Sequence, residues 1–119
     1  MRILIADDSN VMRQIVKRTL RQAGYDADIT EAGNGREAFE SVAASTPDLV
    51  LSDWNMPEMT GLDLLNALRA AGNAVPFGFI TSESSPEMRQ KAASAGARFF
   101  VTKPFTPDSF REALEPVLG

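Results

Sequence analysis

The sequence contains no cysteine and no histidine. The missing cysteine excludes disulfide bonds, thiol nucleophiles and thiolate metal sites. The missing histidine excludes imidazole zinc ligands, Ser–His catalytic arrangements and phosphotransfer through a histidine of this chain. The reactive groups that remain are carboxylates, hydroxyls and amines, and carboxylate oxygens favour hard cations such as Mg²⁺.

Long apolar runs and clusters of basic residues are also missing. No apolar run approaches the roughly 18–20 residues that span a bilayer, and the apolar start at residues 3–6 runs directly into two acids, unlike a signal peptide. The 12 Lys and Arg residues are scattered through a chain of formal net charge −4, so the sequence shows no basic cluster of the kind that binds a nucleic acid. We therefore expect a cytoplasmic protein without membrane insertion or a nucleic-acid partner.

Short apolar runs alternate with stretches of helical spacing along the 119 residues. The predicted strands are 3–6, 49–52, 77–80 and 99–102, with a weaker candidate at 29–31. The first two are almost continuously apolar, as in a sheet buried on both faces. The length fits one domain, so we expect a single domain over residues 1–119 with no second domain attached.

Apolar residues at helical spacing predict the helices between these strands. The stripes are Met12, Ile15, Val16, Thr19, Leu20 and Ala23; then Leu62, Leu65 and Leu68; then Phe110, Ala113, Leu114 and Val117. Capping signals precede or follow several of them, namely Gly24, Thr60 with Asp63, Ser85-Pro86 and Thr106-Pro107. The segment 85–95 has little apolar content, so we expect either a loosely docked, movable helix or a poorly packed edge helix.

Five strands alternating with five helices predict an α/β fold of the flavodoxin-like (βα)5 type. It is a three-layer sandwich with helices on both faces of a parallel sheet in the order 2-1-3-4-5. In open parallel sheets ligands bind beyond the carboxyl ends of the strands where the strand order reverses, here between the first and third strands.

Acidic residues stand at this predicted position. Asp7 and Asp8 follow the first strand and Asp53 follows the third. Like charges this close need a counter-charge, which a divalent cation supplies, and oxygen ligands suit Mg²⁺. Thr81 and Lys103 follow the fourth and fifth strands, where a hydroxyl and an amine would stabilise the oxygens of a phosphoryl group being transferred to a carboxylate.

Each of these residues also has a simpler explanation. An acidic pair in a loop is commonly solvated or caps the next helix, and Asp53 could be a turn residue ahead of Pro57. Thr81 could be an ordinary strand-end hydroxyl and Lys103 a solvated charge. Their combination at four strand ends favours one shared site.

These residues resemble those of the receiver domains of two-component response regulators, and the resemblance covers the whole chain. The matching motifs are Asp7-Asp8-Ser9, Asp53-Trp54-Asn55-Met56-Pro57, Gly61, Thr81-Ser82-Glu83 and Lys103-Pro104-Phe105. The resemblance implies that Asp53 is the phosphoacceptor. It also implies that Mg²⁺ is bound by the side chains of Asp8 and Asp53 and the backbone carbonyl of Asn55, with Asp7 acting mainly through water.

The same resemblance implies roles for the residues of a switch. Thr81 and Lys103 would be the switch hydroxyl and the lysine of the family, and the bond between Lys103 and Pro104 would be cis. Phe100 would be the rotating aromatic residue, a position where many members have Tyr, and Phe cannot donate a phenolic hydrogen bond. Ordinary core packing is the other explanation for Phe100.

Residues 53–59 with Gly61-Leu62, and residues 10–13, are similar to CheY-like chemotaxis regulators. Asn55 and Glu83 occupy two positions that control water access to the acyl phosphate in this family. Their combination resembles that of fast-resetting members, so we expect a short-lived signal.

The family also implies partners. The phosphodonor would be a histidine kinase or a small phosphodonor. The output surface would comprise roughly residues 86–95, 99–102 and 107–118, and it would bind a flagellar motor switch protein or another phosphotransfer protein. We expect a monomer that is no enzyme, although it assists its own phosphorylation and dephosphorylation.

Four alternatives remain at this point. A stand-alone phosphorelay intermediate or kinase regulator would share every site residue. An Asp-nucleophile phosphatase of the haloacid-dehalogenase type needs a D-x-D arrangement, whereas Asp7 and Asp8 are adjacent. A flavin or nucleotide module would hold phosphate at a helix N-terminus, where these two acids would repel it unless a metal intervened. A degenerate receiver would be expected to lack one of the key acids or Lys103.

Overall fold

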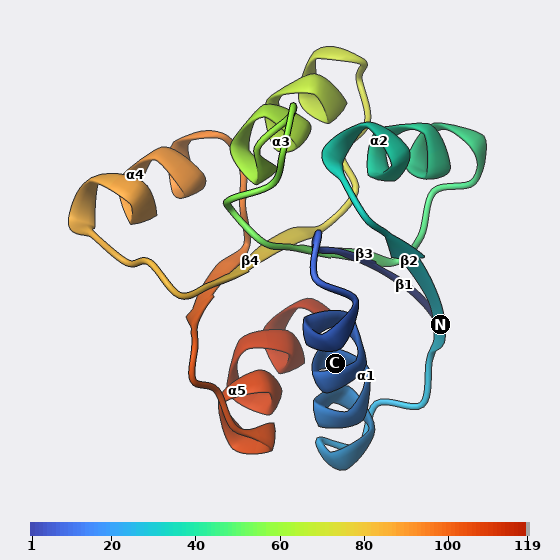
Figure 1. The fold of residues 1–119 in the computed structure, drawn as a ribbon, viewed down its shortest axis with the longest axis vertical. Coiled ribbons are helices and arrows are strands. Elements are labelled where there is room, and N and C mark those ends of the chain that lie inside the picture. The colour runs from blue at the N-terminus through green and yellow to red at the C-terminus, as the bar shows by residue number, and fades with distance from the viewer. Residues whose placement is uncertain (119) are drawn as a thin grey trace.

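The computed structural model describes residues 1–118, and within them five strands alternate with five helices (Figure 1). The strands are β1 (Arg2–Ala6), β2 (Asp28–Ala32), β3 (Leu49–Ser52), β4 (Phe77–Thr81) and β5 (Phe99–Thr102). The helices are α1 (Asn10–Gln22), α2 (Gly35–Ala44), α3 (Gly61–Ala70), α4 (Pro86–Ser94) and α5 (Pro107–Leu118). All strand pairs are parallel, in the order β2-β1-β3-β4-β5, which confirms the flavodoxin-like prediction.

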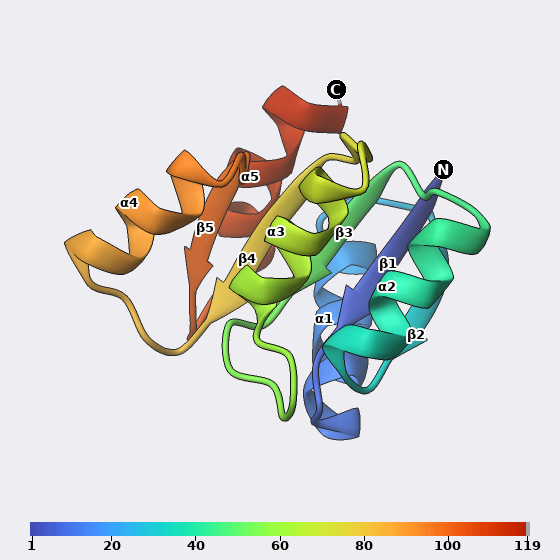
Figure 2. The same ribbon diagram turned by 90° about the horizontal axis from the view of Figure 1, so that it is seen from above.

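The sheet forms the middle of three layers. Helices α1 and α5 cover one face, and α2, α3 and α4 cover the other (Figures 1 and 2). Alternate residues of β1 therefore enter different cores: Leu4 packs in the cluster with α2 and α3, whereas Ile3 and Ile5 pack in the cluster with α1 and α5. Burial on both faces explains why the central strands are almost continuously apolar.

The edge strand β2 shows why its prediction was the weakest. Ala32 is buried, but Asp28, Thr30 and Glu31 are exposed. Ala32 enters one core and Ile29 packs against the other, but the remaining three residues of this edge strand are exposed, so its apolar pattern is faint. The structure extends the predicted segment 29–31 by one residue at each end.

Local capping interactions set the starts of the helices. Ser9 caps α1, with its Oγ accepting from the backbone N–H of Met12 at 3.2 Å, so the acids before it are not the cap. Thr60 and Asp63 form the predicted capping box of α3. Ser85 caps α4 ahead of Pro86 at its start.

Two helices differ from their sequence patterns. In α3 the buried face consists of Gly61, Leu64, Leu65 and Leu68, whereas Leu62 of the predicted stripe is partly exposed. The leucines at 62, 64, 65 and 68 fit more than one stripe, so spacing alone could not choose the face. No stripe was predicted for α2, because its buried residues Gly35, Ala38 and Val42 are small.

The helix α4 is weakly packed, as its sequence predicts. Ala92 is buried, Met88 is half-buried, and the other seven residues of the helix are exposed. Small side chains contribute little burial energy, so α4 is held to the sheet less firmly than its neighbours. Among residues 1–118, no helix has the length and apolarity to cross a bilayer.

A glycine fixes the loop that follows β3. The N–H of Gly61 donates to the carbonyl of Trp54 at 2.8 Å, which folds the loop back onto the start of α3. A Cβ on Gly61 would collide with the backbone oxygen of Asp53 and lie 2.9 Å from Cε1 of Phe79. The loop and the helix can therefore approach this closely only because residue 61 has no side chain.

We predict that Gly61→Ala lowers the free energy of unfolding by about 1–3 kcal/mol, since the backbone of Asp53 must move to accept the methyl group. Urea denaturation followed by far-ultraviolet circular dichroism measures the change. Gly33→Ala is the matched control, because the nearest atom to its Cβ, Oε2 of Glu37, is 3.6 Å away. Equal losses in the two variants would contradict the close approach at Gly61.

Candidate functional site

The ends of β1 and β3 lie side by side. Ala6 pairs with Ser52, so the residues that follow, Asp7 and Asp53, leave the sheet at the same edge. The N–H of Asp53 donates to the carbonyl of Ala6 at 2.9 Å, and that of Asp7 donates to Ala32 at 3.1 Å. Both acids thus have backbones fixed by the sheet, although their side chains project beyond it.

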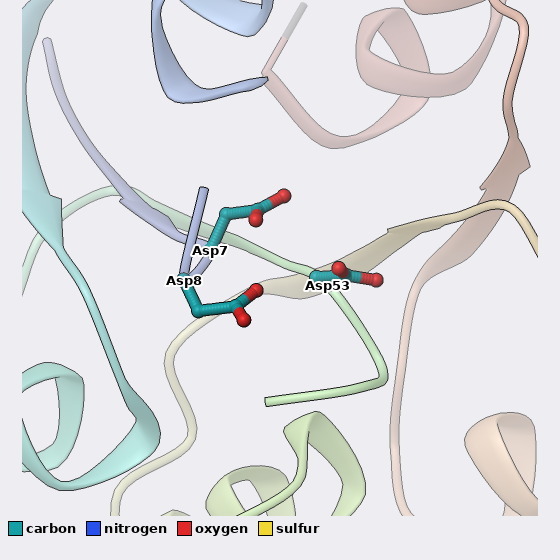
Figure 3. A group of neighbouring side chains, drawn as sticks. All are labelled: Asp7, Asp8 and Asp53. Carbon is teal, nitrogen blue, oxygen red and sulfur yellow. The ribbon is translucent and has the colours of Figure 1, made fainter. Parts of the chain in front are cut away.

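Three carboxylates gather at this edge (Figure 3). One oxygen each from Asp7, Asp8 and Asp53 lies within 4.8 Å of the other two. Asp7 is buried, Asp53 is half-buried and Asp8 is exposed. The sequence predicted this convergence from the positions of the strand ends, and the structure places the three side chains together.

Lys103 contacts the cluster from the loop after β5. Its Nζ is 3.5 Å from Oδ2 of Asp7 and 3.7 Å from Oδ2 of Asp53. One positive charge from Lys103 thus stands against three carboxylates. The remaining negative charge needs a further cation, and the all-oxygen donor set fits Mg²⁺, which binds one or two carboxylates and retains several waters.

The electrostatics of Asp53 are consistent with a site built for a cation. Burial raises the pKa of Asp53 above its ordinary value, and the neighbouring Asp7 raises it further. The ammonium group of Lys103 and the backbone N–H groups of Trp54 and Asn55 act in the opposite direction. The Trp54 N–H donates to Oδ1 of Asp53 at 2.7 Å, which orients the carboxylate.

Thr81 ends β4 at the same edge of the sheet and is fully buried. Its Oγ1 accepts a hydrogen bond from the N–H of Glu83 at 3.3 Å. A hydroxyl that accepts one hydrogen bond still has its own proton to donate. The N–H of Lys103 donates to the carbonyl of Thr81 at 2.9 Å, so the end of β4 and the residue after β5 are held together at this edge.

Asn55 and Glu83 bridge two of the loops around the acids. Nδ2 of Asn55 donates to Oε1 of Glu83 at 3.1 Å, and both side chains are exposed. The sequence identified each position separately, but it did not predict that the two would be in contact.

Phe100 lies half-buried among aromatic rings. Its centroid is 6.0 Å from that of Phe79 and 6.1 Å from that of Trp54. The guanidinium of Arg89, on α4, lies 4.8 Å from the Phe100 centroid, a cation–π contact. Nε of Arg89 also donates to Oγ of Ser84 at 3.0 Å.

The peptide bond between Lys103 and Pro104 is cis, as the resemblance implied. Sequence reasoning missed Arg89 and also Arg13, which contacts the backbone of Asp7. Both are helix side chains whose contacts leave no mark in the apolar spacing.

Comparisons with known proteins identify the family. The model of the response regulator receiver domain matches residues 3–115. The chain is 44% identical to the chemotaxis protein CheY1 of Helicobacter pylori strain J99, over 100% of this chain and 98% of that protein. It is 39% identical to the chemotaxis protein CheY of Pseudomonas aeruginosa, over 98% of this chain and 95% of that protein.

A solved structure supports the same family assignment. The chemotaxis response regulator CheY4 of Vibrio cholerae superimposes with a TM-score of 0.85 and 37% sequence identity, covering 98% of each chain. The strand order, the acidic edge and the full-length similarity agree with one another. The chain therefore belongs to the response regulator receiver domains, and within that family it is CheY-like.

Proposed function

We propose that this chain is a phosphorylatable switch in which Asp53 accepts a phosphoryl group from a histidine kinase or a small phosphodonor. The observation that carries the proposal is the cluster of three carboxylates contacted by a single lysine. Phosphorylation and dependence on Mg²⁺ are general properties of the family to which the chain belongs.

The proposed metal ligands are the side chains of Asp8 and Asp53 and the backbone carbonyl of Asn55, with Asp7 acting mainly through water. Bound there, Mg²⁺ would neutralise the carboxylates and the charge that develops on the phosphoryl oxygens. The three-acid cluster supports this assignment because its oxygens already lie within 4.8 Å of one another.

The residues around Asp53 have distinct proposed tasks. A carboxylate oxygen of Asp53 forms a bond to phosphorus, while the bond from phosphorus to the donor breaks and its electron pair leaves with the donor. Lys103, already beside Oδ2 of Asp53, stabilises a phosphoryl oxygen through its ammonium group. The Thr81 hydroxyl donates its proton in a hydrogen bond to another of these oxygens, a role that its free donor capacity permits.

The signal would leave through binding to another protein. We place the output surface on α4, β5 and α5, with Phe100 as the aromatic residue that changes position after phosphorylation. A flagellar motor switch protein is the favoured partner because relatives over the full chain are chemotaxis proteins. A phosphorelay intermediate or kinase regulator would use the same acceptor site and differ only in its partner. In either role the protein is a monomeric phosphoacceptor rather than an enzyme acting on other substrates.

Fluorescence of Trp54 tests the acceptor site. We predict that millimolar Mg²⁺, followed by beryllium fluoride as a phosphoryl mimic, changes the emission of this single Trp, which lies next to Asp53. Acetyl phosphate should add 80 Da, the mass of one phosphoryl group (PO₃H, about 80 Da by composition), to the wild type and leave Asp53→Asn unmodified. Phosphorylation of a folded Asp53→Asn variant, or no response to Mg²⁺, would refute the proposed site.

The raised pKa of Asp53 leads to a prediction about stability without metal. A carboxyl group whose pKa is raised by folding contributes stability that is present below the unfolded pKa and lost as pH rises through the folded pKa. At pH 7 in a chelator, Asp53→Asn should therefore be more stable than the wild type, and the difference should shrink as pH falls through the raised folded pKa and be lost below about 4.

Denaturant titrations of both proteins from pH 3 to 7 measure this difference. Adding Mg²⁺ at ten times its dissociation constant should stabilise the wild type by about 1.4 kcal/mol and Asp53→Asn by less. A wild type that is the more stable protein at pH 7 in chelator would show that the charge of Asp53 is already balanced.

The contact between Asn55 and Glu83 bears on the lifetime of the signal. We predict that phosphorylated wild type loses its phosphoryl group in well under an hour at neutral pH with Mg²⁺. The rate of this hydrolysis depends on how readily water reaches the acyl phosphate. The loss of protein-bound ³²P after removal of the donor measures the rate. A lifetime of many hours would contradict the assignment of these residues to a fast-resetting site.

A further inference from the structure

Arg13 connects the acidic loop to the edge of the sheet. It lies in the first turn of α1, and its side chain is only 15% exposed. Nη1 donates to the backbone oxygen of Asp7, Nη2 donates to Oδ1 of Asn10 at 3.3 Å, and Nε donates to Oε1 of Glu31 at 3.0 Å. One guanidinium therefore joins the loop after β1, the start of α1 and the strand β2.

Glu31 anchors this guanidinium from the strand. Besides Arg13, it accepts from Nε2 of Gln14 at 3.0 Å and from Nζ of Lys17 at 3.4 Å. Three side chains of α1 thus meet one carboxylate on β2. This network anchors Arg13 to β2.

The bond to Asp7 fixes a peptide group that the acidic cluster depends on. The carbonyl of Asp7 belongs to the peptide that links Asp7 to Asp8. The N–H of Asp7 is already bonded to Ala32, and its Oδ1 accepts from the N–H of Ser9 at 2.9 Å. Arg13 supplies the remaining restraint, so the direction in which the exposed Asp8 carboxylate leaves the chain is set in part by Arg13.

We propose that Arg13 is a positioning residue for the metal site, which orients the Asp7–Asp8 peptide so that both carboxylates face Asp53. This inference rests on the proposed function, since it assigns Mg²⁺ to the cluster. Groups that orient metal ligands commonly change metal affinity by about 10- to 100-fold when they are removed.

The charge of Arg13 allows a sharp test, because orientation and electrostatics predict opposite results. A cation near the cluster repels Mg²⁺, so its removal would tighten binding if charge were its only effect. Loss of orientation would weaken binding instead. Arg13→Lys keeps the charge but replaces the planar fork by one point charge, which cannot reach all three acceptors.

The experiment is a Mg²⁺ titration of the full chain, read by Trp54 fluorescence and, independently, by Mn²⁺ electron paramagnetic resonance. We expect the dissociation constant to rise about tenfold in Arg13→Met and several-fold in Arg13→Lys. Lys17→Met is the matched control, because it removes a cation that shares Glu31 with Arg13, and its affinity should be unchanged or slightly tighter. The increase for Arg13→Met should persist in 0.5 M KCl (a chosen condition, with a Debye length of roughly 4 Å), where simple charge repulsion is screened.

Thermal unfolding of each variant in chelator separates orientation from general stability. A lowered melting temperature with an unchanged dissociation constant would overturn the proposal, and so would tighter binding in Arg13→Met. Arg13→Lys, which retains most of the side chain, keeps the test valid if Arg13→Met does not fold. Failure of the wild type to bind either ion would reject the metal site itself, whereas normal binding by both Arg13 variants would reject only this role of Arg13.

Discussion

The repulsion among three carboxylates at one edge of the sheet is the constraint on which the rest of the site depends. Parallel pairing of β1 with β3 brings Asp7 and Asp53 out of the sheet side by side, and the backbone ladder leaves them no freedom to separate. Among the ion pairs of residues 1–118, Lys103 is the only partner of these two carboxylates. The folded chain thus keeps an unbalanced negative charge at this edge, which a bound cation would offset.

Much of the fold could be predicted because the central strands are buried on both faces. Such strands require nearly continuous apolar sequence, and β3 was predicted with the bounds that the structure shows. The edge strand β2 and the helix α2 gave weak signals, since three of the five residues of β2 are exposed and the buried residues of α2 are small. In α3 the cap was predictable from Thr60, but the buried face was not, because neighbouring leucines fit several stripes.

The positions of the site residues could be predicted for a different reason. Residues that follow parallel strands lie at one edge of the sheet, and the strand order makes β1 and β3 neighbours, so Asp7, Asp8 and Asp53 come together. The contacts made by long side chains could not be predicted in this way. The reach of Arg13 to Asp7 and of Arg89 over Phe100 depends on rotamers and on the packing of helices, which residue spacing does not encode.

The shallow packing of α4 has a consequence for how this protein can diverge. Seven of its nine residues are exposed, and Ala92 is its buried residue, so most substitutions there remove little buried surface. The outer face of α4 can therefore change its shape and charge while the sheet and the acidic edge stay intact. New binding preferences can therefore arise on this helix without a loss of the fold. Related domains could come to bind different partners through changes in α4 alone.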